Sequence, residues 1–589
     1  MCSEEHQQAR DAFLLWCSNA KPRSGPIFQL MRISRARFKS VVRQCKAKSN
    51  NKESDLLAQK LLKCNGKDFW KEIKKINSKH LHTPLAETVN GQTGADNICE
   101  MWRQQFSNLL NSATCKAEAS IDSDPENMCF ERFTHEEVSQ AIKVLKSGKS
   151  HGKDKLCGEH YIHADNKINV LLSMFFNAVI CHGYIPIGLM ETIIVPIVKD
   201  KKGDIGSKDN YRPIALTSIL SKIFEILILT RYQSMLTTTD NQFGFKQKHS
   251  TELCAYTLKQ VIEYYKTNSS PIYLCFLDAS KAFDRVNHEI LFEKLRKRKI
   301  PHMIVRILQI WYSSQTFSVQ WGHVSSIAFK VSNGVRQGGI LSPVLFNVYV
   351  DCLSVKLASV STGCYVNDVC YNHLIYADDT VLLAPSPKAL QILIDICAAY
   401  AKDNDLIFNA KKTKTMCIKP KLLKCLYVPK FYLDETVICS VDHETYLGFI
   451  VNKEFTDNDH MSKEMRNIYA RGNMLIRNFK HCTNDVKIKL YRTFCSSIYC
   501  CPLWYNFKES SFRKIHVATN KVFKSLMQMP RDYSASHLFV STGVDNFSVL
   551  RRKLVYSLKT RVLNSLNLLV INISASTSFM HRYWKTVLY

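Results

Sequence analysis

Two adjacent acidic residues, Asp378 and Asp379, lie between two apolar segments, residues 374–377 and 380–383, that are rich in strand-forming side chains. This pattern predicts a β-hairpin with two carboxylates at its tip. Holding two like charges at one partly buried point is electrostatically costly. A bound divalent cation would reverse that repulsion, because it is the largest local charge. An Asp-Asp pair is also common in plain hairpin turns, so the pair alone leaves both a structural turn and a metal site open.

A third acidic residue, Asp278, ends a continuous apolar run at residues 271–277. Such a run predicts a strand covered on both faces, and residues 279–284 predict a turn into a helix that continues past His288. Three carboxylates at strand and hairpin ends suit two Mg²⁺ ions, which bind few carboxylates and take other ligands from substrate phosphates. Two ions about 3.5–4 Å apart can activate a 3′-hydroxyl and stabilise a leaving pyrophosphate.

A glycine-rich segment, residues 333–343, lies between these acidic motifs in the sequence. Its three glycines allow the backbone to approach a ligand closely. Ser342 and Pro343 predict the start of an apolar helix over residues 344–350, with the proline in the first turn. Taken alone, such a segment is equally well explained as a simple turn.

Two basic residues, Lys199 and Arg212, flank a predicted turn after an apolar strand at residues 192–198. Arginine binds phosphate oxygens as a fork, and lysine acts as a point charge. The two side chains therefore suit a triphosphate group, although an ordinary solvated hairpin remains the alternative.

Three motifs occur in a fixed order along the chain: the strand that ends at Asp278, the glycine-rich segment at residues 333–343, and the hairpin with Asp378 and Asp379. This order resembles that of the reverse transcriptases of non-LTR (LINE-type) retrotransposons, with jockey-like features. The closest matches to the family pattern are residues 276–284 and the Tyr-Ala-Asp-Asp tetrad at residues 376–379. The resemblance implies an α+β right-hand polymerase of fingers, palm and thumb. It also implies an RNA-directed DNA polymerase that extends a DNA 3′ end by target-primed reverse transcription.

The resemblance also assigns roles to single residues. The implied catalytic residues are Asp278, Asp378, Asp379 and Lys412. The three aspartates would bind metal, and Lys412 would protonate pyrophosphate. The implied nucleotide-binding residues are Lys199, Arg212, Ala279, Phe283, Gln337 and Gly338. The implied primer grip, which holds the primer end, consists of Tyr446, Leu447 and Gly448. Phe283 would collide with a ribose 2′-hydroxyl, whereas Asp284 is expected to be structural. Residues 242–247 resemble a family block that contacts the template.

The implied cofactors are two Mg²⁺ ions, with Mn²⁺ as a substitute, and the implied partners are an RNA template, a DNA primer or target, and deoxynucleoside triphosphates. The chain starts within what resembles the linker that follows an endonuclease, so we expect that nuclease to be supplied elsewhere. Two other hypotheses stay open. One is an inactive retrotransposon fragment that only binds nucleic acid, and the other is an RNA-templated RNA polymerase.

The charge balance supports a polyanionic partner. The 589 residues include 80 Lys and Arg against 51 Asp and Glu, a net charge of +29. Such an excess favours binding to phosphate backbones, but it is also typical of ribosomal, chromatin and membrane-surface proteins. No apolar run predicts a membrane span. The 22 scattered cysteines and the lack of a visible signal peptide predict an intracellular protein with reduced thiols. Family logic implies action in the nucleus and RNA binding in the cytoplasm.

The predicted domains are a basic helical linker and N-terminal extension at residues 1–130, fingers and palm at 131–455, and a helical thumb with a C-terminal region at 456–589. Within the first, a basic helical stretch around residues 32–48 is followed by a second predicted helix at residues 55–75.

Overall fold

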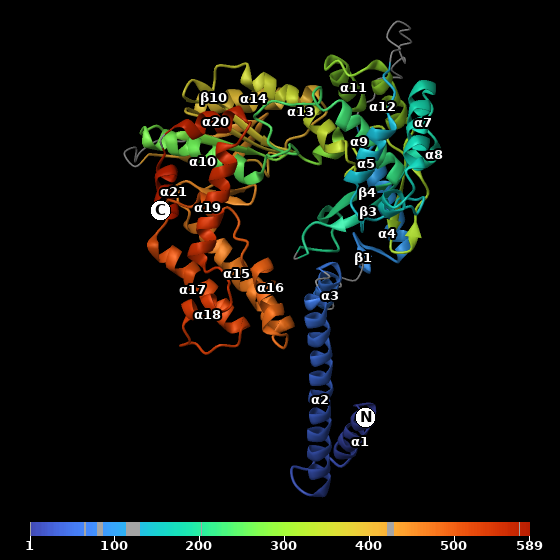
Figure 1. Cartoon of the computed structure of the whole chain (residues 1–589), viewed down its shortest axis with the longest axis vertical. Coiled ribbons are helices and arrows are strands. Elements are labelled where there is room, and N and C mark those ends of the chain that lie inside the picture. The colour runs from blue at the N-terminus through green and yellow to red at the C-terminus, as the bar shows by residue number, and fades with distance from the viewer. Residues whose placement is uncertain are drawn as a thin grey trace. The chain divides into compact units, whose positions relative to one another are not determined.

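The computed structural model describes residues 2–63, 66–78, 86–112, 130–201, 203–420, 429–576 and 578–589. The chain forms two compact units, each built from two separate stretches of sequence (Figure 1). Unit 1 comprises Met1–His82 and Asp457–Tyr556, and unit 2 comprises Thr83–Thr456 and Ser557–Tyr589. The domain boundaries predicted from the sequence remain a proposal.

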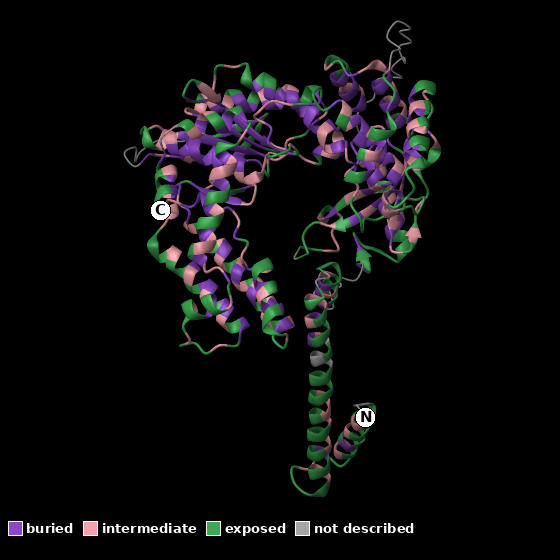
Figure 2. Ribbon diagram, viewed as in Figure 1, coloured by how far each residue is buried: buried purple, intermediate pink, exposed green. Residues whose placement is uncertain are grey.

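Unit 1 is helical in its described residues, apart from connecting turns. Its helices are α1 (Cys2–Ser18), α2 (Pro26–Leu62), α3 (Gly66–Ser78), α15 (Asn458–Phe479), α16 (Asn484–Phe494), α17 (Glu509–Leu526), α18 (Ala535–Ser541) and the first part of α19 (Phe547–Leu563). Most of α2 is exposed along its described length (Figure 2). The predicted helix at residues 55–75 was wrong in its bounds, because α2 runs on to Leu62 and α3 begins at Gly66.

The N-terminal helices of unit 1 pack against helices that lie more than 400 residues later in the sequence. Ser54 donates a hydrogen bond to the carbonyl of His481 at 3.1 Å, and the ring of Trp70 lies 6.3 Å from that of Phe494. The amphipathic face of α3 buries Phe69 and Ile73. The basic N-terminal helices and the helices after residue 457 therefore share one compact unit.

Unit 2 is organised around a six-stranded sheet with the order β11-β12-β5-β13-β15-β14. These strands are β5 (Ile272–Leu277), β11 (His373–Tyr376), β12 (Asp379–Ala384), β13 (Lys414–Ile418), β14 (Phe431–Leu433) and β15 (Thr436–Ser440). β5 lies between β12 and β13 and pairs antiparallel with both. Every residue of β5 is buried, as its continuous apolar sequence predicts.

Helices cover both faces of this sheet, which explains the burial of β5 (Figure 1). On one face, Cys275 belongs to the same apolar core as Leu393 and Cys397 of α14 (Pro387–Asp403). The neighbouring residue Phe276 points the other way and contacts the ring of Tyr446 at 5.8 Å. α10 (Thr251–Thr267) and α13 (Ser342–Ala358) also belong to this unit. The helix predicted for residues 344–350 is thus longer than expected.

A second sheet in unit 2 has the order β4-β3-β6-β7, with β8 paired to β6. Its strands are β3 (Glu191–Val198), β4 (Tyr211–Thr217), β6 (Thr316–Trp321), β7 (Val324–Ser325) and β8 (Phe329–Lys330). Trp102 of α4 (Ala95–Leu109) is fully buried in the apolar cluster beside it. Unit 2 also contains the helices α5 (His135–Val144), α6 (Gly158–Ile162), α7 (Lys167–His182), α8 (Ile187–Met190), α9 (Ile219–Arg231), α11 (His288–Lys297) and α12 (His302–Ser314).

Three short hairpins and two C-terminal helices complete unit 2. The hairpins are β1–β2 (Thr88–Val89 and Gln92–Thr93), β9–β10 (Cys364–Val366 and Val369–Tyr371) and β16–β17 (His443–Tyr446 and Phe449–Asn452). The helices are α20 (Leu568–Ala575) and α21 (Phe579–Leu588), and the ring of Trp584 stacks on Tyr256 of α10 at 5.8 Å. Unit 2 is thus mixed α and β, as predicted. None of the helices in the described part of the chain is long and apolar enough to cross a membrane.

Candidate active site

The predicted acidic hairpin forms at the end of the central sheet. Tyr376 of β11 pairs with Asp379 of β12, which leaves Ala377 and Asp378 as a two-residue turn. Ala377 has a φ of 60°, in the left-handed region that a side chain makes unfavourable. Antiparallel pairing of Thr380 with Leu277 puts Asp379 beside the end of β5, where Asp278 follows. The sheet therefore brings the three predicted acidic residues to one edge.

Burial and repulsion by neighbouring acids disfavour the charged forms of Asp378 and Asp379. Partial burial, together with the nearby Asp378 and Asp278, raises the pKa of Asp379 to about 6. Burial is also the main cause that raises the pKa of Asp378, with Asp278 adding to the effect and Arg212 opposing it. Both side chains still have a face open to solvent. Hard divalent cations prefer such carboxylate oxygens.

The carboxylates fit a divalent cation by their chemistry, but they do not form a ready-made metal centre. Among the described residues, no three His, Cys, Asp or Glu side chains converge closely enough to hold one ion. Sites that bind Mg²⁺ through few carboxylates are completed by substrate phosphates and water.

Lys412 lies next to Asp278. Its Nζ is 3.9 Å from Oδ2 of Asp278, and 68% of the Lys412 side chain is exposed. The backbone nitrogen of Asn409 donates a 2.8 Å hydrogen bond to the carbonyl of Asp278, which fixes the Lys412 loop against the end of β5. Lys412 therefore reaches the acidic edge from β13's side of the sheet.

The two predicted phosphate-binding cations share one face of the β3–β4 hairpin. Arg212 pairs directly with Ile197, and Lys199 follows Ile197 by two residues, so period-two alternation places them on the same side. Burial is the largest cause that lowers the pKa of Lys199, and the neighbouring cations Arg212, Lys281 and Lys412 lower it further. This hairpin therefore carries a cluster of positive charge, and Arg212 lies near enough to Asp378 to oppose the rise in the pKa of that carboxyl group.

The glycine-rich loop is fixed between the two sheets of unit 2. The backbone nitrogen of Ala215 in β4 donates a 2.8 Å hydrogen bond to the carbonyl of Gln337. Gly338 has a φ of 131°, and a Cβ there would lie 2.6 Å from the carbonyl oxygen of Ala215. Only glycine fits that approach. Gln337 Nε2 in turn donates a 2.7 Å hydrogen bond to Oδ1 of Asp284.

A buried ion pair supports the same loop from behind. Nη2 of Arg336 lies 2.8 Å from Oε1 of Glu225, and both side chains are 1% exposed. Glu225 also accepts a hydrogen bond from the backbone of Leu341 at 3.2 Å, at the start of α13. The guanidinium lies 4.3 Å from the ring centroid of Trp311. No local pattern predicts this pair, because its members lie 111 residues apart in the sequence.

Phe283 is half-buried near the acidic edge. Its ring stacks on that of Phe346 at 4.4 Å, and the ring of Phe245 approaches it edge-on at 6.1 Å. The predicted continuous helix after residue 279 was wrong. A short 3₁₀ turn, Ala282–Arg285, comes first, and α11 begins only at His288. Asn287 has extended backbone angles and caps α11 with its side chain, which separates the two elements.

Two further predicted segments pack next to the central sheet. Ala279 forms a β-bridge with Phe408, directly after Asp278. Leu447 and Gly448 have φ values of 49° and 81° and form the turn of the β16–β17 hairpin. Positive φ at both positions is typical of a type I′ turn. Tyr446 is buried, and its hydroxyl donates to the carbonyl of Leu374 in β11 at 3.3 Å.

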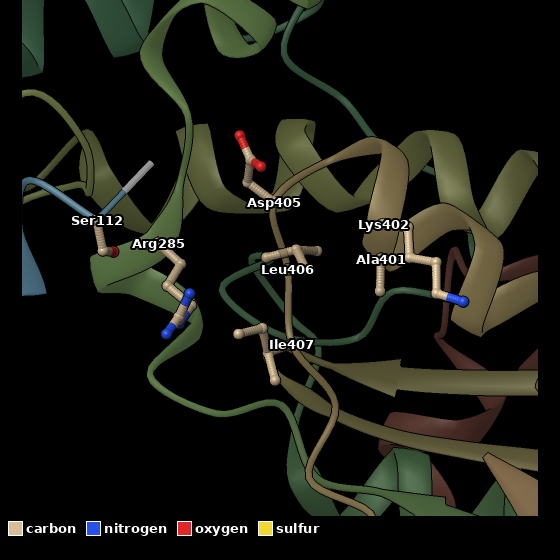
Figure 3. A pocket seen from close by; sticks show the side chains of 7 residues that line it. All are labelled: Ser112, Arg285, Ala401, Lys402, Asp405, Leu406 and Ile407. Atoms are coloured by element: carbon tan, nitrogen blue, oxygen red, sulfur yellow. The ribbon is translucent and has the colours of Figure 1, made fainter. Parts of the chain in front are cut away.

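A pocket of about 220 Å³ lies close to this site but contains none of the predicted acidic ligands. Its lining residues are Ser112, Arg285, Ala401, Lys402, Asp405, Leu406 and Ile407 (Figure 3). The carbonyl of Ile407 accepts a 2.8 Å hydrogen bond from the backbone of Ser280, two residues after Asp278. The pocket wall is therefore part of the support of the acidic strand end.

Comparison with known proteins finds similarity to one family in the central part of the chain. Residues 199–451 match the reverse transcriptase (RNA-dependent DNA polymerase) family. The chain is 27% identical over 446 residues to the probable RNA-directed DNA polymerase from transposon BS of Drosophila melanogaster, covering 72% of this chain and 47% of that protein. It is 25% identical over 417 residues to the RNA-directed DNA polymerase from mobile element jockey of Drosophila funebris, covering 67% of this chain and 44% of that protein.

The chain thus spans somewhat less than half the length of these curated relatives. Among solved structures it is similar to apo telomerase from Candida tropicalis, with a TM-score of 0.35 and 14% identity, over 72% of this chain and 70% of that one. Residues 199–451 thus match a reverse transcriptase, and over about two thirds of its length the chain is similar to RNA-directed DNA polymerases of LINE-type, non-LTR retrotransposons.

Proposed function

We propose that this chain extends a DNA 3′ end along an RNA template by nucleotidyl transfer. The observation that carries the proposal is the position of Asp278, Asp378 and Asp379 at one edge of a sheet, with Arg212 of the cationic β3–β4 hairpin close enough to act on Asp378. An acidic edge facing a basic hairpin suits a metal-bound triphosphate, because each partner neutralises one part of it.

In this proposal the three aspartates hold two Mg²⁺ ions, for which Mn²⁺ can substitute. When bound, such ions supply charge stabilisation to both the attacking and the leaving oxygen. Lys199 and Arg212 bind the triphosphate, and Lys412 donates a proton to the departing pyrophosphate. The 3.9 Å separation of Lys412 from Asp278 supports this role, because it puts the ammonium beside the metal ligands.

The remaining residues orient the nucleotide and the primer. Ala279, Gln337 and Gly338 contact the incoming nucleotide, and Phe283 excludes a ribose 2′-hydroxyl. Tyr446, Leu447 and Gly448 hold the primer end. The tight turn at residues 447–448 and the buried Tyr446 support that assignment, because they give the hairpin a rigid attachment to β11.

At the level of the element, we propose target-primed reverse transcription of an RNA template at a nicked DNA target in the nucleus, after RNA binding in the cytoplasm. The nick is made by an endonuclease supplied elsewhere. Residues 131–455 would then be the fingers and palm, residues 456–589 the thumb and C-terminal region, and residues 1–130 a basic extension.

The test is extension of a DNA primer on a heteropolymeric RNA template, followed by sequencing of the product. We expect a faithful complementary copy with deoxynucleotides and Mg²⁺, and none when Asp378 is replaced in the Asp378→Asn variant. Asp368→Asn is the matched control, since Asp368 is an exposed acid in the turn of the β9–β10 hairpin. Salt-sensitive RNA binding without a copy would favour an inactive binding protein instead.

A further inference from the structure

A segment that precedes α10 pairs with the outer edge of β11, next to the acidic turn. The backbone nitrogen of Ile375 donates to the carbonyl of Asn241 at 2.8 Å, and that of Phe243 donates to the carbonyl of Ile375 at 2.8 Å. Asn241 also donates from its side chain to the carbonyl of His373 at 2.8 Å. Residues 241–243 therefore extend the sheet beyond β11 and end beside the Ala377–Asp378 turn.

The side chain of Gln242 forms hydrogen bonds to the backbone of that turn. Its Oε1 accepts hydrogen bonds from the backbone nitrogens of Ala377 at 3.0 Å and Gly244 at 2.7 Å. Its Nε2 lies 3.5 Å from the carbonyl oxygen of Ala377, to which it donates a long hydrogen bond. Gln242 is 1% exposed. Both backbone polar groups of Ala377 thus have the same buried partner.

Close packing shields this contact. A Cβ at Gly244 would lie 2.4 Å from the backbone nitrogen of Ala377, so this position requires glycine. The carbonyl of Gly244 accepts a 2.8 Å hydrogen bond from Asn347 of α13, which is also buried. Residues 242–244 are therefore held from behind while Gln242 reaches the turn.

The backbone of Ala377 explains why the turn needs such a partner. A non-glycine residue in the left-handed region costs of order 1–3 kcal/mol and persists only where its surroundings enforce it. Ala377 has this conformation with a φ of 60°, directly before Asp378. Without enforcement the turn would relax, and the directions of Asp378 and Asp379 would change with it.

We propose that Gln242 is a positioning residue, which enforces the strained turn at Ala377 and thereby keeps Asp378 and Asp379 aimed at the substrate side. This inference rests on the proposed polymerase function. Gln242 touches the backbone of the turn and no reacting atom. Its role differs from the template contact that the sequence suggested for residues 242–247, because a side chain that is 1% exposed cannot reach a template.

The test compares Gln242→Met, which has similar volume but no amide, with Gln260→Met as the matched control. Gln260 is 2% exposed on α10, and its side-chain amide donates to Glu263 of the same helix at 3.3 Å. For Gln242→Met we expect kcat for nucleotide addition to fall about 10-fold or more, the typical loss when a partner that orients a metal ligand is removed. We expect the KM for the nucleotide and the affinity for the RNA–DNA duplex to stay within about twofold. Gln242 contacts neither ligand, so the substitution removes no interaction that contributes to binding them in the ground state.

A second variant separates positioning from general stability. Glycine adopts positive φ without strain, so Ala377→Gly should recover part of the lost kcat when it is added to Gln242→Met. Hydrogen exchange supplies a readout that does not depend on activity: amides at residues 375–380 should exchange faster in Gln242→Met and those of α14 should not. Should Gln242→Met fail to fold, Gln242→Asn, which is too short to reach Ala377, takes its place.

The outcomes are distinguishable. An inactive parent chain overturns the proposed function, and hydrogen exchange still tests the grip on the turn. An active parent whose Gln242→Met variant keeps its kcat and its exchange pattern overturns the positioning role. Loss of activity that Gln260→Met reproduces, or that Ala377→Gly does not relieve at all, also overturns it.

Discussion

Gln337 donates a hydrogen bond of 2.7 Å from Nε2 to Oδ1 of Asp284. The carboxyl group of Asp284 is buried, and burial raises its pKa to about 6 although the Gln337 amide opposes the shift. The carbonyl of Asp284 also accepts a 2.6 Å hydrogen bond from Asn333 of the same loop. Asp284, which the resemblance left as structural, therefore fixes the side chain that is proposed to contact the nucleotide.

Removing this acceptor should weaken nucleotide binding. In Asp284→Ala, the Gln337 amide loses its partner, and we expect the KM for dTTP to rise about 5- to 30-fold, in line with about 1–2 kcal/mol for an unmade hydrogen bond. Asp284→Asn keeps an acceptor oxygen and should raise the KM far less. Steady-state kinetics on one primer–template measures both, and equal effects of the two variants would contradict the orienting role.

Replacing Phe283 should relax sugar discrimination. The ring is held by stacking on Phe346 at 4.4 Å, so its edge has a fixed position. We expect Phe283→Val to incorporate ribonucleotides at least 10-fold more efficiently relative to deoxynucleotides, a difference of about 1.4 kcal/mol. Competition between dTTP and UTP on one template measures the ratio. An unchanged ratio would show that Phe283 is only a core aromatic residue.

Breaking the buried pair behind the loop should destabilise unit 2. Arg336→Met leaves Glu225 charged and 1% exposed without its cation, and we expect a loss of about 3–5 kcal/mol in the free energy of unfolding. Adding Glu225→Gln removes that charge and keeps an oxygen for the Leu341 amide. The double variant should therefore be more stable than Arg336→Met alone in urea unfolding, and a lower stability would argue against a charge-based cost.

Acid should destabilise the fold through His288. Its ring is buried, and its Nε2 lies 2.8 Å from the carbonyl oxygen of Gly334 in the glycine-rich loop. Burial lowers the pKa of His288 from 6.5 to about 4. A lowered pKa in the folded state means that the unfolded chain binds the proton first. Stability is therefore full above pH 6.5 and falls as the pH drops toward 4.

The size of this effect follows from the shift. Between pH 7.5 and pH 5.5, the parent should lose about 1 kcal/mol more than His288→Gln, which keeps a donor for Gly334 but does not titrate. Asp284 titrates in the opposite sense and is common to both proteins, so the difference isolates His288. Urea unfolding at the two pH values measures it, and identical losses would contradict the assignment.

The sequence was sufficient where a pattern is local. The apolar run before Asp278 became β5, and the two apolar runs on either side of Asp378 and Asp379 became β11 and β12, because both signals are carried by consecutive residues. The start of α14 is also set by local residues, because the Ser386 side chain caps the helix and Pro387 occupies its first turn. The bounds of α2 could not be predicted as well, since no proline or glycine interrupts residues 27–62.

Contacts between distant segments could not be read from the sequence. Gln242 and Ala377, which are joined by hydrogen bonds, lie 135 residues apart in the sequence, and the ion pair of Glu225 and Arg336 joins residues that are 111 apart. The return of α20 and α21 to unit 2 depends on contacts such as that of Trp584 with Tyr256. Such pairs leave no periodic signal, because each partner fits its own helix or loop equally well without the other.

The most direct measurement of the central claim is nucleotide addition on a poly(rA)/oligo(dT) duplex with dTTP and Mg²⁺, by the parent chain, Asp378→Ala and Asp368→Asn. Duplex binding is measured in parallel for all three. The account predicts extension by the parent and by Asp368→Asn, and none by Asp378→Ala despite retained binding. Extension by Asp378→Ala at the parent's rate, or tight binding by the parent without any extension, would contradict it.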